Sequence, residues 1–531
     1  KPCGNAMKCG MADGRLYDAV IVGLDPVGDV ALIKLFGRTD FPCAEIGDSD
    51  QVPAGDVCFA MGNPFLLASD LQPTLTHGII SGVHRYQYPS GTLLEYAECL
   101  QTDASINPGN SGGPLFDAQG RLIGINGRAS FQKRGRVNVG IAYAISINQI
   151  KNFLGCLKSG RIVDHATLGA VVSADQDRRV TVSDILDQSD AYRRGLRFGD
   201  EIVSLAGRPV DTPNAFKNVL GTLPKDWRVP LSYRRDGKRQ DILVRLAGLH
   251  TEEELLSKIS GPDRPSPMPI PKPNDKPPPG GKKPDKPVPD PKPSDRDEDP
   301  SPQPSPDENP LHAMEAKTPM PEIVKQHFEA KRGYANYYFN RLERDRVWKA
   351  WTARVGSGSA AASWDISGPL DNGGKYRFEI SDSEALLGLP AGESKWASTD
   401  EIGASLTPLG SGGLFPALFL WRRLAVAGPQ AYGEVHYLGT VPLDGRNEMV
   451  DVLVGLHGGV ECRFLFDPKS GLLVGIELFP ETHADPCEVR LFDYREVDGR
   501  QRPGRMEVWH GAERFASFKI DRFSVDKPMQ P

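Results

Sequence analysis

The first 150 residues alternate apolar and polar positions in many short runs, with glycine-containing turns between them. Residues 17–23 and 30–35 follow one another across a short turn, and residues 114–116 and 122–126 do the same further on. Alternating runs joined by turns predict hairpins of β-strands, and many short strands without long helices favour a barrel. We therefore expect a barrel-forming β unit over residues 1–160.

A second folded unit and a linker follow. Residues 168–172 have the pattern of a strand, and the mixed strand and helix signals after them predict a small αβ domain over 161–250. Residues 252–260 fit a short helix. Residues 261–310 then hold 19 of the chain's 46 prolines among Lys, Asp and Ser. Such a composition cannot bury a core, so we expect an extended linker spanning residues 251–310.

Residues 311–531 regain a globular composition. Residues 321–332 have the spacing of an amphipathic helix, and repeated strand–turn–strand patterns come after it. The clearest predicted strands are 460–466, 472–478, 489–494, 505–510 and 515–523. The pattern predicts an antiparallel meander that forms a curved sheet or a half-barrel, with one helix. The whole chain is therefore expected to be multidomain and mainly β.

Bulk properties narrow the class of protein. At 531 residues the chain is too long for one core, and a net charge of −6 gives no nucleic-acid footprint. The longest apolar run, near Leu414–Trp421, contains Pro416 and stops at Arg422, so it is too short to span a membrane. No apolar segment follows Lys1, so we expect no signal peptide in this chain, and the absence of an initial Met suggests that the natural N-terminus lies elsewhere.

Cysteines and histidines give little sign of a metal site. The eight cysteines contain no C-x-x-C pair, and no histidine stands at zinc-ligand spacing from them. We expect small buried side chains or an occasional disulfide, and no metal or organic cofactor. A metal near the C-terminal histidines is the weaker alternative to simple strand-surface positions; the residues concerned are His457, Glu461, His483, Asp485 and His510.

Ser111 lies in the run Gly109-Asn110-Ser111-Gly112-Gly113. Flanking glycines allow a turn so tight that the hydroxyl projects from it and backbone N–H groups point at one spot, as an oxyanion hole requires. The letters also fit the nucleophile elbow of α/β-hydrolases, but that elbow leads directly into a helix and here a hairpin follows. A plain glycine-rich surface turn is the remaining alternative.

Four motifs, in order and spacing, resemble the HtrA/Deg branch of trypsin-like serine proteases. They are Asp25-Pro-x-x-Asp29-Val-Ala-Leu-Ile-Lys34, Gly62-Asn-Pro-Phe65, Gln101-Thr-Asp-Ala-x-Ile-Asn-x-Gly-Asn-Ser-Gly-Gly113 and Gly140-Ile-Ala-Tyr-Ala-Ile145. The resemblance covers residues 1–250. It implies a trypsin-like double β-barrel, incomplete at its N-terminus, followed by a bacterial-type PDZ domain.

The resemblance also implies the roles of individual residues. Ser111 would be the nucleophile and Asp29 the acid that orients the base, with an oxyanion hole at Gly109, Asn110 and Ser111. Substrate would be bound by Ile106, Ile141 and Ala142 along the S1 pocket, and by Asn126, Gly127 and Arg128 at a strand edge. The mainly apolar pocket predicts cleavage after apolar side chains. Leu168, Gly169 and Ala170 would receive a peptide C-terminus in the PDZ domain.

The catalytic histidine is the missing part of this constellation. In this fold the chain order is His, Asp, Ser, and the family places the histidine roughly thirty residues before the aspartate. That position would lie upstream of Lys1, while His77, His84 and His165 all follow Asp29 and are expected in loops or on the surface. We therefore favour a chain that lacks its N-terminal portion over a natural pseudoprotease. By itself such a chain should be nearly inactive. Whether the coding sequence upstream of Lys1 encodes a histidine at the catalytic position distinguishes a truncated protease from a pseudoprotease.

The resemblance thus predicts a serine endopeptidase that acts on unfolded or damaged proteins in the cell envelope and assembles as a homo-trimer. One alternative is a non-catalytic scaffold that binds polypeptides. A third hypothesis concerns the run Asp493–Gly499 with Pro503 and residues 506–508, which weakly resembles the LolA-like half-barrel that carries lipoproteins. It implies an envelope lipid-binding protein that acts through residues 311–531.

Overall fold

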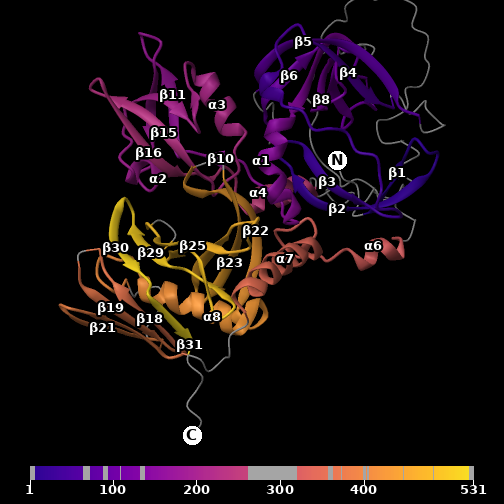
Figure 1. Cartoon of the computed structure of the whole chain (residues 1–531). Helices are drawn as coiled ribbons and strands as arrows, with labels where there is room; N and C mark the ends of the chain where they lie inside the picture. Colours follow the sequence, from indigo (N-terminus) through magenta and orange to yellow (C-terminus); the bar gives the residue numbers. More distant parts are fainter. Residues whose placement is uncertain are drawn as a thin grey trace, which may run out of the picture.

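The computed structural model places three folded bodies around one helix, α1 (Ile147–Lys158) (Figure 1). It describes residues 6–63, 72–87, 94–107, 109–131, 138–260, 320–356, 363–371, 373–398, 402, 406–445, 448–481 and 484–525. The proline-rich stretch predicted as a linker lies outside these residues, apart from its first turns. Across the described residues, no helix is both long and apolar enough to cross a membrane.

The first body contains one closed β-barrel. Its strands are, in order around the barrel, β4 (Val57–Gly62), β5 (Thr74–Gln87), β6 (Tyr96–Thr102), β9 (Asn138–Ser146), β8 (Leu122–Phe131) and β7 (Pro114–Asp117). The interior is filled by small and branched side chains such as Ala60, Ile80 and Leu115, each without exposed surface. β7 and β8 form the hairpin that was predicted after Ser111.

A three-stranded sheet lies beside the barrel, where the sequence predicted part of a second barrel. It consists of β1 (Ala6–Gly10), β2 (Leu16–Asp25) and β3 (Val30–Leu35). All of its pairings are antiparallel. The turn between β2 and β3 carries Asp29, so this sheet positions the predicted catalytic acid.

The second body is the small αβ domain. Its sheet has the order β11 (Ala170–Ala174), β12 (Val180–Ile185), β13 (Glu201–Leu205), β15 (Arg228–Arg235) and β16 (Lys238–Arg245). Two helices, α2 (Asp190–Arg193) and α3 (Pro213–Gly221), complete it, each begun by a side-chain cap, Ser189 and Thr212 respectively. β11 is the edge strand of this sheet and contacts α3.

The third body is the predicted antiparallel meander. A seven-stranded sheet runs β22 (Glu434–Pro442), β23 (Met449–His457), β24 (Val460–Phe466), β25 (Leu473–Phe479), β26 (Cys487–Phe492), β29 (Arg505–His510) and β30 (Glu513–Lys519). A five-stranded sheet runs β21 (Gly392–Ala397), β20 (Glu384–Leu389), β19 (Lys375–Ile380), β18 (Trp364–Pro369) and β31 (Arg522–Val525). A bridge between Leu370 and Phe518 joins the two sheets.

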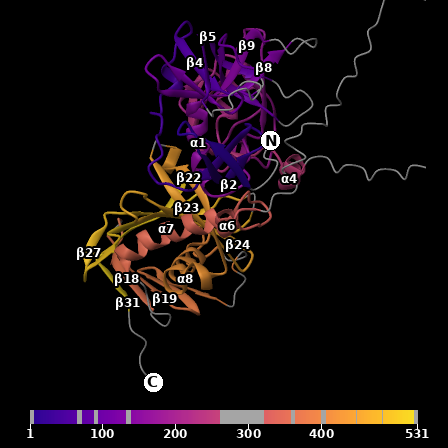
Figure 2. The same cartoon turned by 90° about the vertical axis from the view of Figure 1, so that its right-hand side faces the viewer.

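The helices of this body correct the sequence analysis. The predicted helix over 321–332 is only α6 (Glu322–Gln326), and two longer helices, α7 (Tyr337–Val355) and α8 (Leu414–Tyr432), were missed. The sequence shows α8 only as an apolar run because its first part, Leu414–Trp421, is apolar on all sides, as expected of a helix that packs against both sheets (Figure 2). Pro416 is tolerated because it lies in the first turn.

The described residues that precede and follow the proline-rich stretch contact one another. Arg332 Nε lies 2.9 Å from Glu252 Oε1 of α4 (Glu252–Ser260), a helix with the bounds predicted from the sequence. The third body also packs on α1, where a Cβ added at Gly155 would lie 2.1 Å from Thr440 Oγ1. The third body is therefore in direct contact with the first body, and residues after the proline-rich stretch lie against residues before it.

The described cysteines and histidines form no metal site. Seven cysteines are described and all are free thiols, four of them buried. No group of three or more His, Cys, Asp or Glu side chains in the described part of the chain is arranged to hold a metal ion. His483, one of the residues in the weaker metal hypothesis, lies outside the described residues.

Candidate active site

Ser111 lies in an exposed, tight turn between β6 and β7. Gly109 and Gly112 adopt positive φ angles of 108° and 85°, which only glycine adopts readily. Gly113 approaches the barrel so closely that a Cβ there would lie 2.1 Å from the Met61 carbonyl oxygen. These glycines are required by the backbone path, and they leave the Ser111 hydroxyl at the surface, where it donates a hydrogen bond of 3.0 Å to the Gly127 carbonyl.

The backbone N–H groups of this turn fall into two sets. Those of Asn110, Gly112 and Gly113 donate to the carbonyls of Asn107, Asn126 and Asn110. The N–H groups of Gly109 and Ser111 form no hydrogen bond with any described residue. Within the described structure, the predicted oxyanion-hole N–H groups of Gly109 and Ser111 are therefore unbonded, whereas the N–H of Asn110, which the sequence analysis also assigned to the hole, is already bonded.

Asp29 is joined to the serine turn through a residue that sequence reasoning missed. The Tyr96 hydroxyl donates to Asp29 Oδ2 at 2.9 Å. The Tyr96 ring also packs on Gly127, where an added Cβ would lie 2.7 Å from Tyr96 Cε1. The Gly127 carbonyl accepts the hydrogen bond from Ser111. Tyr96 therefore contacts Asp29 directly and also contacts the residue to which Ser111 is hydrogen-bonded. Nothing in the local pattern of β6 marks Tyr96 for this position.

The predicted substrate-binding residues divide by exposure. Ile106 and Ala142 are 1% and 0% exposed and belong to the barrel core, so they contribute no open pocket surface in this structure. Asn126 is also buried, and its amide donates to the Pro114 carbonyl. Ile141 is 37% exposed. Arg128 contributes backbone to β8, next to Gly127, at an irregularity in the pairing with β9.

The histidines are placed differently from one another. His77 lies exposed on β5, as expected of a surface residue. His84 is exposed and its Nδ1 lies 2.6 Å from Glu98 Oε2. The expectation for His165 was wrong: it is 1% exposed, stacked on Phe153 and paired with Asp25. Among the described residues, Ser111 Oγ forms no hydrogen bond with an imidazole.

The predicted peptide-binding loop of the second body lies at the start of edge strand β11. Gly169 has a φ of 72° and its carbonyl accepts from the N–H of Leu186. A Cβ added at Gly169 would lie 2.6 Å from Ser189 Cβ, so the loop is pressed against the cap of α2. Leu168 is buried beneath it, and Ala170 begins the strand opposite Ile185.

Comparisons with known proteins assign the first two bodies to domain families. Residues 3–125 match the trypsin-like peptidase domain model, and residues 166–246 match the PDZ domain model. The periplasmic serine endoprotease DegP of Escherichia coli K12 is 36% identical over 252 residues, which cover 45% of this chain and 51% of DegP. The N-terminal part of the chain belongs to the HtrA family. The second body is accordingly its PDZ domain.

Further proteins are similar to this part of the chain. A probable periplasmic DegP-like endoprotease of Chlamydia trachomatis is 35% identical, over 45% of this chain and 49% of the relative. Among solved structures, the HtrA-type protease AlgW with tripeptide matches at 31% identity with a TM-score of 0.38, over 46% of this chain and 81% of that one. The chain spans about half the length of the curated relatives that it matches, and these matches leave the third body unaccounted for.

Proposed function

We propose that the protein is a serine endopeptidase of the HtrA type that hydrolyses unfolded or damaged polypeptides. The observation that carries the proposal is the serine turn itself. It exposes the Ser111 hydroxyl in the same turn as the N–H groups of Gly109 and Ser111, which form no hydrogen bond within the described part of the chain. In the reaction Ser111 Oγ attacks the scissile carbonyl, and the two N–H groups stabilise the negative oxygen that develops.

Proton transfer requires a base that the described residues do not provide. An imidazole would take the Ser111 proton and return it to the leaving amine, and Asp29 would hold that imidazole in the productive tautomer. Tyr96 supports this role because its hydroxyl fixes the Asp29 carboxylate. Without the imidazole, binding and the oxyanion hole alone leave a small residual rate.

Reaction with a fluorophosphonate probe tests the proposal. The protein is produced as its gene encodes it, including whatever residues precede Lys1, and is compared with residues 1–531. Labelling of the gene-encoded protein that disappears in Ser111→Ala, together with cleavage of unfolded casein, supports an endopeptidase. Peptide binding without labelling would instead support the non-catalytic scaffold, and lipid extraction without labelling would support the lipid carrier.

The PDZ domain is proposed to capture polypeptide C-termini. β11 offers an open edge beside α3, and the Leu168–Ala170 loop lies at its start. A peptide would add there as a strand.

We further propose domain limits of 1–160, 161–250 and 311–531, with a linker at 251–310. We also propose a location in the cell envelope, in line with the periplasmic relatives. Finally, we propose that the protein assembles as a homo-trimer, which light scattering tests.

A further inference from the structure

The third body has an open strand edge beside a separate ribbon. β31 is the last strand of the five-stranded sheet and, among the described strands, pairs only with β18. β27 (Arg495–Val497) and β28 (Arg500–Arg502) pair with each other and with no other described strand. A groove of about 540 Å³ lies between β31 and this ribbon and is lined by both. An open strand edge of this kind can accept an added strand.

The groove carries positive charge that its own acids do not neutralise. Four arginines line it, against two acidic residues; they are Arg495, Arg500, Arg502 and Arg522, with Asp498 and Asp521. Within the described part of the chain, none of the four forms a salt bridge. Arg495 donates to the backbone carbonyls of Ile520 and Asp521, and Arg502 to that of Val355. Burial and the neighbouring charge of Arg500 lower the pKa of Arg502, as expected of cations that lack an anion.

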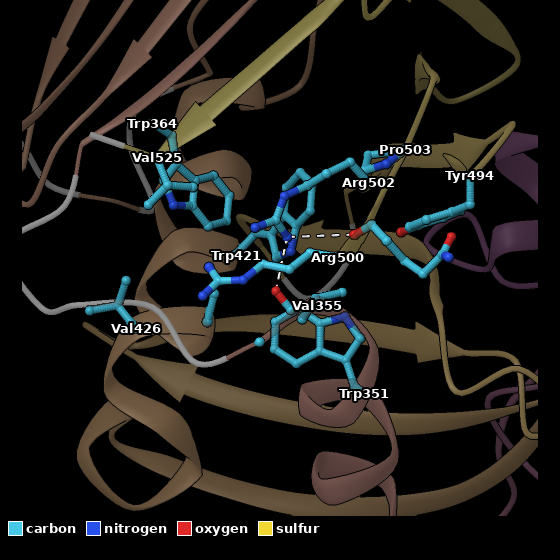
Figure 3. Close-up of a pocket in the computed structure, with 13 residues that line it drawn as sticks. Trp351, Val355, Trp364, Trp421, Val426, Tyr494, Arg500, Arg502, Pro503 and Val525 are labelled. Carbon is cyan, nitrogen blue, oxygen red and sulfur yellow. Dashed lines mark hydrogen bonds between the residues drawn. The ribbon is translucent and has the colours of Figure 1, made fainter. Parts of the chain in front are cut away.

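The groove adjoins a small aromatic cavity of about 40 Å³ (Figure 3). Three tryptophans, Trp351, Trp364 and Trp421, line the cavity, and Arg500 and Arg502 line both the cavity and the groove. Trp351 and Trp421 are 3% and 4% exposed, and the indole N–H of each has no hydrogen-bond partner among the described residues. The indole rings present mostly apolar surface, so the cavity suits an apolar group rather than a charged one.

We propose that the groove and cavity together bind the C-terminal end of an extended polypeptide that finishes in a small aliphatic residue. The peptide backbone pairs with the open edge of β31, and its terminal carboxylate meets Arg500 and Arg502. The last side chain enters the tryptophan-lined cavity. A cavity that holds benzene measures roughly 150 Å³, so this one admits a short side chain and excludes a lipid tail. The site is independent of Ser111.

A photo-crosslinking experiment on the full chain tests this proposal. The probe is a six-residue peptide that ends in Ala-Val with a free carboxylate and carries benzophenone at its N-terminus. Mapping the crosslinks separates this groove from the PDZ domain, which we also expect to take C-termini. We expect crosslinks to residues 495–502 or 520–525, and at least about tenfold weaker crosslinking there with the C-terminally amidated peptide.

Substitutions identify the groove. Arg500→Glu and Arg522→Glu replace exposed side chains that hold no salt bridge in the described structure, so the fold should persist. Lys349→Glu, on an exposed face of α7 in the same body, makes the same charge change outside the groove. We expect either groove variant, but not Lys349→Glu, to weaken crosslinking in the groove about tenfold. Crosslinks confined to β11, or equal crosslinking in all variants, would overturn the proposal. So would anionic phospholipid vesicles that bind through Arg500 while the peptide does not.

Discussion

His165 Nε2 lies 2.9 Å from Asp25 Oδ2, and each side chain is 1% exposed. The pair joins the last residue of β2 in the protease unit to the start of the PDZ domain. Asp25 also accepts the backbone N–H groups of Val27 and Gly28, which shape the turn that carries Asp29. Burial by itself would lower the pKa of His165, but the Asp25 carboxylate, together with the charges of Glu95 and Asp164, raises it above its ordinary value.

Asp25→Asn should make the protein less stable, most strongly in acid. The folded-state pKa of His165 lies above its unfolded value of about 6.5, so stabilisation by the pair is complete below that pH and is lost as the pH rises through the folded pKa. We expect a loss of about 3 kcal/mol near pH 6. Urea unfolding between pH 5.5 and 9 measures this effect. The difference in the free energy of unfolding between wild type and Asp25→Asn should become smaller as the pH rises. A gap independent of pH would contradict a charged pair.

His436 should give the opposite pH dependence. Burial, then the charges of Arg161 and Lys331, lower its pKa, and its Nδ1 has no hydrogen-bond partner among the described residues. The unfolded chain therefore takes up a proton below about pH 6.5 while the folded chain does not, which costs up to about 1.4 kcal/mol per pH unit as the pH falls. His436→Phe should flatten the stability profile below pH 6.5 relative to wild type. The exposed His77→Phe serves as the control and should leave the slope unchanged.

Arg463 should stabilise the contact between the PDZ domain and the third body. Its guanidinium lies 2.9 Å from Asp226 Oδ1 of the PDZ domain and is 11% exposed. Although burial opposes it, Arg463 holds the pKa of the Asp226 carboxyl below its ordinary value. Arg463→Met leaves that carboxylate without its partner, so we expect a loss of about 3 kcal/mol in urea unfolding.

A matched exposed pair provides the control for Arg463. Arg179 is 53% exposed and pairs with Asp175 at 3.0 Å on the PDZ surface. Arg179→Met should leave the free energy of unfolding almost unchanged, because water already solvates both charges. Equal losses in the two variants would mean that the interface ion pair adds no more than a surface one.

Tyr96→Phe tests the support of Asp29. The substitution removes one hydrogen bond to the carboxylate and keeps the ring that packs on Gly127. In the gene-encoded protein, if it shows peptidase activity, we expect kcat/KM to fall about five- to tenfold with little change in KM. Tyr86→Phe removes a comparable bond, from Tyr86 to Glu95, and should leave the rate unchanged. A similar loss in both variants would place the effect in the general stability of the barrel.

Much of the fold could be predicted from local pattern. The hairpins of residues 460–510 were placed within two residues of their observed limits, since alternation and turn residues fix a strand's register together. The predicted strand over 515–523 is in fact two, β30 and β31, separated by residues 520–521. The serine turn was equally readable, because its glycines are required by the turn itself.

The sequence by itself determined the protease and PDZ motifs, the proline-rich break and the antiparallel class of the third body, since each depends on residues close together in the chain. Tertiary structure alone decided the rest. Tyr96 and Asp29 are 67 positions apart, and His165 and Asp25 are 140 apart. Partners of this kind carry no periodicity that marks them. α8 shows the same limit, because its first part, Leu414–Trp421, is buried on every side and has no polar face to reveal it.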